Sequence, residues 1–301
     1  MNNKLSILGI ILVIGGLVLA VLLNKVELKT PSGTTKIKVT VSFYPLEFLA
    51  QTIGGQYVTI TTLTPPGAEP HDFEPSTRDI AQLTSQDIIL LNGGELEEYA
   101  DKIKENIDPA KTNLIFAGNP FMNDPKDPHV WLDPVLYKKE AELVAAVFAQ
   151  SDPEHAKFYA SNMQKLSAEL DGLDGQFRRG LENCTQKEIV TSHKAFGYMA
   201  QQYGFEQIAL AGFSPDEEPS SKTLADVATY AKTHKINYIF FEKLVSPAIA
   251  ETVAREVGAK TLVLDPLEGM TKSDKQSGKT YFTVQKENLH NLHIALDCKN
   301  P

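Results

Sequence analysis

The sequence is poor in cysteine and lacks the short motifs of common enzymes. Among its 301 residues there are two cysteines, Cys184 and Cys298, without the C-x-x-C spacing of a redox or zinc-binding pair. It contains no His-Glu-x-x-His, no Gly-x-Ser-x-Gly and no glycine-rich phosphate loop. We therefore expect a protein that is not an enzyme and has no catalytic residues, and we keep an extracellular zinc hydrolase only as an alternative.

The chain also has no excess of positive charge. Its net charge of −9 argues against binding to nucleic acid. No low-complexity tract and no close internal repeat is visible in the sequence. A hydrophobic fraction of 42% and a charged fraction of 22% are typical of globular proteins, and 301 residues are enough for two domains.

One long hydrophobic run stands at the N-terminus. Leu5 to Leu23 form 19 residues without a charge, close to the roughly 20 that cross a bilayer as a helix. We interpret residues 1–23 as an uncleaved signal anchor that tethers the protein outside the cytoplasm. The alternative is a cleaved signal peptide and a periplasmic or secreted protein, but Val18-Leu19-Ala20 matches a cleavage site poorly. Residues 24–36 are predicted to be a polar spacer.

An exported chain with an even number of cysteines permits a disulfide bond. A bond between Cys184 and Cys298 would tie the C-terminus to the start of a second domain. Two buried thiols are the alternative.

Short β-branched runs alternate with helical patterns along the rest of the chain. Strands that alternate with helices of ten or more residues predict parallel sheets, and near-continuous apolar runs fit strands that are covered on both faces. The pattern predicts an α/β fold with two sets of four strands, at residues 36–41, 58–63, 87–91 and 113–116, then 188–191, 207–210, 238–241 and 261–264.

A long helix is predicted between the two sets. Asp152 and Pro153 suit a helix start, and apolar residues from Phe158 to Leu181 recur at roughly helical spacing. About 29 residues would span roughly 43 Å and join two α/β lobes stiffly. The expected domains are therefore residues 37–151, the linker helix 152–183, and residues 184–301.

Three histidines lie in loops rather than in helical patterns. His71 follows the second strand through a proline-rich turn, His129 precedes the capped helix start Asp133-Pro134, and His193 follows the fifth strand. Ligands of open α/β sheets bind outside the carboxyl ends of the strands. Because imidazole is the commonest metal ligand, the three histidines predict a metal site between the two lobes. After the last strand, Asp265 or Glu268 is expected to complete a tetrahedron.

The segments around these residues resemble a known family. They are Gly67-Ala-Glu-Pro-His-Asp-Phe-Glu-Pro-Ser76, Asp127-Pro-His-Val-Trp-Leu-Asp133, Thr191-Ser-His-Lys-Ala-Phe-Gly-Tyr198, Glu218-Pro-Ser220 and Leu264-Asp-Pro-Leu-Glu-Gly269. Together they resemble the zinc- and manganese-binding solute-binding proteins of ABC importers, from about Ile37 to the C-terminus. The resemblance implies two α/β lobes joined by one long rigid helix, with the metal in the cleft between them. It also implies that the ion is captured outside the membrane and handed to a permease and its ATPase, and we expect the receptor to be a monomer.

The resemblance further implies the ligands. His71, His129 and His193 fall on the family's three imidazole positions, and Glu268 matches a glutamate used by some zinc-binding members, with Asp265 or water as the alternative. Manganese-preferring members tend to have a glutamate at the position of His193. Because nitrogen ligands favour zinc, we expect Zn²⁺ to be the transported ion, with Mn²⁺ possible.

Other side chains are expected to support the ligands. Acceptors should orient the imidazole rings, and the candidates are Glu69, Asp72, Glu74 and Glu242, with an ordinary surface charge as the alternative for each. Three aromatic residues are expected to shield the site from water, with ordinary core packing as the alternative: Trp131, Phe73 and Phe196.

The chain departs from the family pattern in two places. Residues 119–127 have no histidine where many zinc-binding members carry a His-rich loop, and no cysteine lies near the N-terminus to carry a lipid. A metal-dependent cell-surface adhesin remains a further alternative, because some relatives have been given that role.

Overall fold

The computed structural model describes residues 36–299. The predicted signal anchor, and all but the last residue of the predicted spacer, lie outside this range. Within residues 36–299, no helix is both long enough and apolar enough to cross a membrane.

The first lobe contains a parallel four-stranded sheet with the strand order β2-β1-β3-β4. Its strands are β1 (Ile37–Val41), β2 (Val58–Thr62), β3 (Ile88–Leu91) and β4 (Asn113–Phe116). Each predicted strand is confirmed to within one residue at either end.

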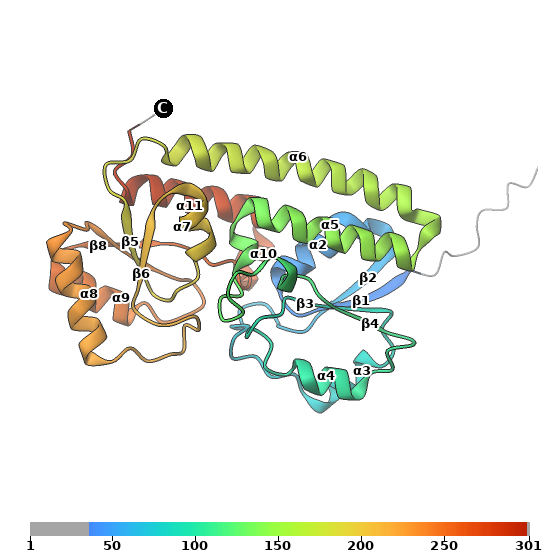
Figure 1. Ribbon diagram of the computed structural model, residues 1–301. Helices are drawn as coiled ribbons and strands as arrows, with labels where there is room; N and C mark the ends of the chain where they lie inside the picture. The colour runs from blue at the N-terminus through green and yellow to red at the C-terminus, as the bar shows by residue number, and fades with distance from the viewer. Residues whose placement is uncertain (1–35, 300–301) are drawn as a thin grey trace, which may run out of the picture. The chain divides into compact units, whose positions relative to one another are not determined.

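Helices cover both faces of this sheet, which explains its apolar sequence. In β3, Ile88 and Leu90 point into the main hydrophobic core, whereas Ile89 and Leu91 pack with Tyr99 in a second cluster on the opposite face. The helices are α2 (Tyr44–Gly54) and α5 (Pro134–Ser151) on the first side and α3 (Thr77–Leu83) and α4 (Ala100–Asn106) on the second (Figure 1).

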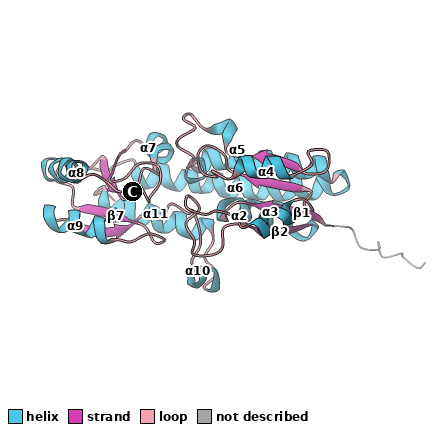
Figure 2. Cartoon of the chain, turned by 90° about the horizontal axis from the view of Figure 1, so that it is seen from below, coloured by secondary structure: helices cyan, strands magenta, loops and turns pink. Residues whose placement is uncertain are grey.

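The second lobe repeats this arrangement with the strand order β6-β5-β7-β8. Its strands are β5 (Glu188–Thr191), β6 (Glu206–Ala209), β7 (Tyr238–Phe241) and β8 (Lys260–Val263). Four of its helices lie around the strands in Figure 2, namely α7 (Gly197–Tyr203), α8 (Ser221–Thr233), α9 (Ala248–Val257) and α11 (Tyr281–Ala295). The short helix α10 (Lys272–Gln276) lies apart from these strands and contacts the first lobe, where Lys275 Nζ is 2.9 Å from the carboxylate of Glu47 in α2. The prediction of an α/β fold with two parallel four-stranded sheets is confirmed.

The long helix α6 (Ala156–Leu181) runs along both lobes (Figure 1). Its buried stripe from Met163 to Leu181 is the predicted one, and Tyr159 rather than Phe158 is its fully buried first aromatic residue. The same hydrophobic core includes residues of α5 from the first lobe and of α7 and α11 from the second. A shared core of this kind resists bending between the lobes.

The start of the helix differs from the expectation. Residues Pro153–His155 form a short 3-10 turn before α6, and Asp152 does not cap it through its side chain. Instead, the Asp152 carboxylate accepts hydrogen bonds from His155 Nδ1 at 2.6 Å and from the Tyr159 hydroxyl at 2.8 Å. Its side chain is therefore engaged by the residues that follow, rather than by the backbone of the first turn.

Cys184 and Cys298 form a disulfide bond across 114 positions. The bond joins the segment after α6 to the segment after α11, as the first interpretation expected. The alternative of two buried thiols is wrong.

Candidate metal centre

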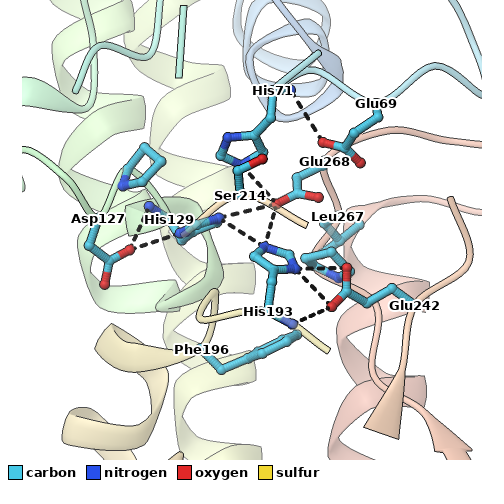
Figure 3. Close-up of polar contacts among 12 residues, drawn as sticks. Glu69, His71, Asp127, His129, His193, Phe196, Ser214, Glu242, Leu267 and Glu268 are labelled. Carbon is cyan, nitrogen blue, oxygen red and sulfur yellow. Dashed lines mark hydrogen bonds and ion pairs between the residues drawn. The ribbon is translucent and has the colours of Figure 1, made fainter. Parts of the chain in front are cut away.

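Four side chains from distant loops meet between the two lobes (Figure 3). His71 lies in the loop after β2, and His129 lies just before the short 3-10 helix Val130–Leu132 that precedes α5. His193 follows β5, and Glu268 follows β8. The structure therefore brings together all three predicted histidines and the preferred fourth residue.

Local sequence fixes the loops that carry these residues. The loop of His71 ends at Ser76, whose side chain forms a capping box with Asp79 at the start of α3. The loop of His129 ends at Asp133, which caps α5 by accepting a hydrogen bond from the Val135 N–H. Both helix starts restrict where the preceding histidine can lie.

The distances between the converging atoms match a tetrahedral ion. Glu268 Oε1 lies 3.1 Å from His129 Nε2, 3.1 Å from His193 Nε2 and 3.5 Å from His71 Nε2. The Nε2 atoms of His129 and His193 are 3.3 Å apart, and all four atoms lie within 4.8 Å of one another. Four ligands at about 2.0–2.1 Å from a zinc ion would be separated by about 3.3 Å. Four of the six separations among these atoms, from 3.1 to 3.5 Å, are therefore close to those expected around a tetrahedral zinc ion.

Carboxylates hold the outer nitrogens of two rings. Asp127 Oδ1 lies 2.8 Å from His129 Nδ1, and both carboxylate oxygens of Glu242 lie 2.8 Å from His193 Nδ1 (Figure 3). Nδ1 of each neutral ring must then carry the proton, because a carboxylate only accepts hydrogen bonds. The lone pairs of both Nε2 atoms consequently point at each other and at Glu268.

Charges in the site shift the pKa values of its groups in different directions. Burial alone would lower the pKa of His193, but the charges of Glu242 and Glu268 outweigh it and raise this pKa well above its usual value. For His129, burial is likewise outweighed by the hydrogen bonds that its ring donates to the Asp127 and Glu268 carboxylates, so its pKa is raised. For His71, burial dominates and lowers the pKa. Burial would raise the pKa of Glu268, yet the neighbouring histidines hold it well below its usual value.

His71 differs from the other two histidines in its surroundings. The His129 and His193 side chains are fully buried, whereas the His71 side chain keeps 5% of its exposure and lines a cavity of about 690 Å³. Its backbone N–H donates to Glu69 Oε1 at 3.3 Å. Burial, followed by the charge of Glu268, raises the pKa of Glu69 to about 10.

The sequence identified some of the supporting residues but missed one. Glu242 was among the four expected ring-orienting acceptors, and it does contact His193. Glu69 holds the backbone of His71 instead of its ring, and Asp72 and Glu74 line the outer cavity. Asp127 was not singled out, although its position two residues before His129 was a usable signal.

Asp265, the alternative fourth residue, lies outside the cluster. Its carboxylate contacts Lys243 Nζ at 2.8 Å and accepts a hydrogen bond from the Leu267 N–H at 2.9 Å. Of the aromatic residues expected around the site, Trp131 lies against His129 with 5.1 Å between ring centroids, and Phe196 is fully buried. Phe73 packs against Tyr99 and lines the outer cavity.

The fold and the site define a class of protein, a two-lobed α/β protein with a metal site between its lobes. Comparison with known proteins narrows this class. Residues 39–295 match the family model described as "Zinc-uptake complex component A periplasmic", ZnuA. The chain therefore belongs to the ZnuA family of zinc-binding components of ABC uptake systems, which bind their ion and are not enzymes.

Comparisons with individual relatives support this family assignment. The chain is 34% identical to the high-affinity zinc uptake system protein ZnuA of Bacillus subtilis over 88% of this chain and 89% of that protein. It is 33% identical to the zinc-binding protein AdcA of Streptococcus pyogenes serotype M18, but spans only 56% of that protein's length. The crystal structure of the Zn(II)-bound ZnuA-like domain of Streptococcus pneumoniae AdcA superimposes with a TM-score of 0.78 at 34% identity, over 87% of this chain and 99% of that domain.

Proposed function

We propose that this chain captures one Zn²⁺ ion with His71, His129, His193 and Glu268 and delivers it to an ABC permease. The main support is the convergence of Nε2 lone pairs and a carboxylate oxygen on one point. Such an arrangement is repulsive unless protons or a cation occupy its centre.

Ligand chemistry supports zinc as the ion. Three imidazoles and one carboxylate make a nitrogen-rich, four-coordinate set that suits Zn²⁺, whereas Mn²⁺ prefers more oxygen ligands and a higher coordination number. In the proposed complex each ring binds through Nε2, and Asp127 and Glu242 keep two of the rings in the required tautomer.

The remaining parts of the proposal concern partners and placement. The receptor acts as a monomer that docks onto a membrane permease driven by its ATPase, and it is tethered by the apolar segment 5–23. Its parts are residues 37–151 as the first lobe, residues 152–183 as the linker helix and residues 184–301 as the second lobe. The family membership and the core shared along α6 support this division.

Calorimetric titration with elemental analysis tests the proposal. The full chain, purified in detergent and freed of metal with a chelator, should bind one Zn²⁺ and prefer it to Mn²⁺ at neutral pH. His193→Ala should weaken zinc binding by more than the 10–100-fold typical of residues that only support a ligand. His234→Ala is the matched control, because His234 is a more exposed histidine paired with Glu188. Unchanged zinc affinity in His193→Ala would refute the ligand set.

A further inference from the structure

The segment that carries Glu268 contains a backbone conformation that its sequence does not favour. Leu267, the residue before Glu268, is fully buried and has a φ of 57°. A leucine rarely adopts this left-handed region, because its Cβ approaches the following carbonyl group. Something outside the turn must therefore hold it in place.

Asn288 of α11 stabilises this turn through two side-chain hydrogen bonds to Asp265. Its side-chain Nδ2 donates to the Asp265 carbonyl at 2.7 Å, and its Oδ1 accepts from the Asp265 N–H at 2.9 Å. Asn288 is 1% exposed, so water does not compete for these two bonds. Asp265 in turn accepts from the Leu267 N–H and contacts Lys243, which places its carboxylate inside the turn.

The same helix also holds the segment that follows His129. The Tyr281 hydroxyl donates to the Trp131 carbonyl at 2.8 Å, and Gln285 Nε2 donates to the Leu132 carbonyl at 3.2 Å. Trp131 Nε1 in turn donates to the Pro266 carbonyl at 2.7 Å, so the segment after His129 is bonded directly to the turn before Glu268. Tyr281, Gln285 and Asn288 are spaced so that they share one buried face of α11.

One oxygen of Glu268 is thereby aimed at the site. Oε1 lies within 3.5 Å of all three Nε2 atoms, whereas Oε2 has no hydrogen-bond partner within residues 36–299. To bind an ion through both oxygens, the carboxylate would have to turn, and the braced 265–267 segment opposes that movement.

We propose that Asn288 is a positioning residue that fixes Glu268 as a one-oxygen ligand and so favours Zn²⁺ over Mn²⁺. A rigid pocket with four ligands suits Zn²⁺, which commonly adopts tetrahedral coordination. Mn²⁺ would need additional oxygens from a second carboxylate contact or from water. This inference rests on the proposed ligand set, with Glu268 as its fourth member.

The test compares two asparagines of the same helix. Asn288→Ala releases the turn, whereas Asn291→Ala releases only the Val263 carbonyl, to which Asn291 Nδ2 donates at 2.8 Å. We expect Asn288→Ala to lower zinc affinity about 10-fold, as is typical for residues that orient a ligand, and to lower manganese affinity less, so that the ratio of zinc to manganese affinity falls. Asn291→Ala should leave the ratio unchanged even where it lowers the melting temperature. Both ratios come from calorimetric titrations with each metal.

Two further measurements separate positioning from general stability. Co²⁺ bound to the unaltered chain should show the intense visible absorption of a tetrahedral site, and Asn288→Ala should weaken that absorption. Adding Leu267→Gly to Asn288→Ala should restore part of the ratio, because glycine adopts the left-handed conformation without strain. If Asn288→Ala does not fold, Asn288→Asp keeps the size of the side chain and the acceptor for the Asp265 N–H but places a carboxylate oxygen against the Asp265 carbonyl, and a loss of selectivity in the same direction is expected.

The outcomes are distinct. An unchanged ratio in the Asn288 variants, or an equal loss in Asn291→Ala, overturns the role of Asn288 while leaving the ligand set intact. If Glu268→Ala binds zinc as tightly as the unaltered chain, the ligand set itself fails, and this inference fails with it.

Discussion

Glu268 in the metal centre and Glu140 in α5 are both almost completely removed from water, with exposed fractions of 1% and 0%. Their pKa values nevertheless shift in opposite directions. The pKa of Glu268 lies well below its usual value, whereas burial, assisted by the charge of Glu97, raises that of Glu140 to about 8. The two carboxyl groups differ in their neighbours rather than in their depth.

The neighbours explain this contrast. Glu268 faces three imidazoles, which offer protons or share a cation with it. Neither oxygen of Glu140 has a hydrogen-bond partner in the part of the chain that the structure describes. A buried carboxylate without a partner takes up a proton, and one beside cationic groups stays charged. Burial alone therefore does not identify a functional acid in this protein, but burial combined with converging ligands does.

The largest contrast is expected from the same substitution at the two positions. Glu268→Gln keeps the shape of the side chain but removes the charge that faces the ion, so we expect zinc affinity to fall at least about 100-fold, at or beyond the upper end of the range for supporting residues. Glu140→Gln is the matched control and should bind zinc as the unaltered chain does. Calorimetric titration of both variants at pH 7 measures the difference. Equal affinities in the two variants would contradict the role of Glu268.

A second prediction reverses the comparison and concerns stability. The pKa of Glu140 is higher in the folded state than in the unfolded chain, so the unfolded chain releases this proton first as pH rises. The free energy of unfolding should therefore fall between about pH 4.5 and pH 8, by about 2 kcal/mol from pH 5 to pH 7. Glu140→Gln removes this loss and should be more stable than the unaltered chain at pH 7.

Denaturant unfolding of the metal-free chain at several pH values checks this prediction. Glu142→Gln, at an exposed position of the same helix, is the control and should keep the pH dependence of the unaltered chain. If all three proteins show parallel stability curves, Glu140 does not hold a proton in the folded state.

Much of the fold could be predicted because its strands are buried on both faces. Runs such as Ile88 to Leu91 and Tyr238 to Phe241 are apolar throughout, and each is a strand of a parallel sheet. The 3-10 turn at Pro153–His155 was not predictable, because proline suits the first turn of either helix type. The disulfide bond remained one of two interpretations, since sequence alone does not show whether the cysteines are close in space.

The candidate site was predictable where a residue and its role lie in the same segment. His71, His129 and His193 stand in loops with distinctive neighbours, and the choice between Asp265 and Glu268 needed the structure. The contact between Lys243 and Asp265 joins residues from different loops of the second lobe, and nothing in either segment indicates it. Likewise, the sequence suggests that Asn288 and Gln285 are exposed polar residues of a surface helix. Both are in fact buried, and they bond the backbone of the segments next to Glu268 and His129.

The smallest predicted effect concerns Glu242, which supports a ligand without facing the ion. Glu242→Gln weakens the orientation of the His193 ring, so zinc affinity at neutral pH should fall about 10-fold.

The same substitution removes a charge that raises the pKa of His193. In the unaltered chain a proton on His193 therefore competes with zinc already at pH values above the usual histidine pKa of about 6.5. Zinc affinity should consequently begin to decline above about pH 6.5 as the solution is acidified. In Glu242→Gln this decline should move to lower pH, so the affinities of the two proteins should approach each other as the solution is acidified. Zinc titrations from pH 8 to pH 5.5 measure both effects, with Asp127→Asn as the equivalent change at His129. Curves that remain parallel over this range would mean that Glu242 orients the ring without controlling its proton.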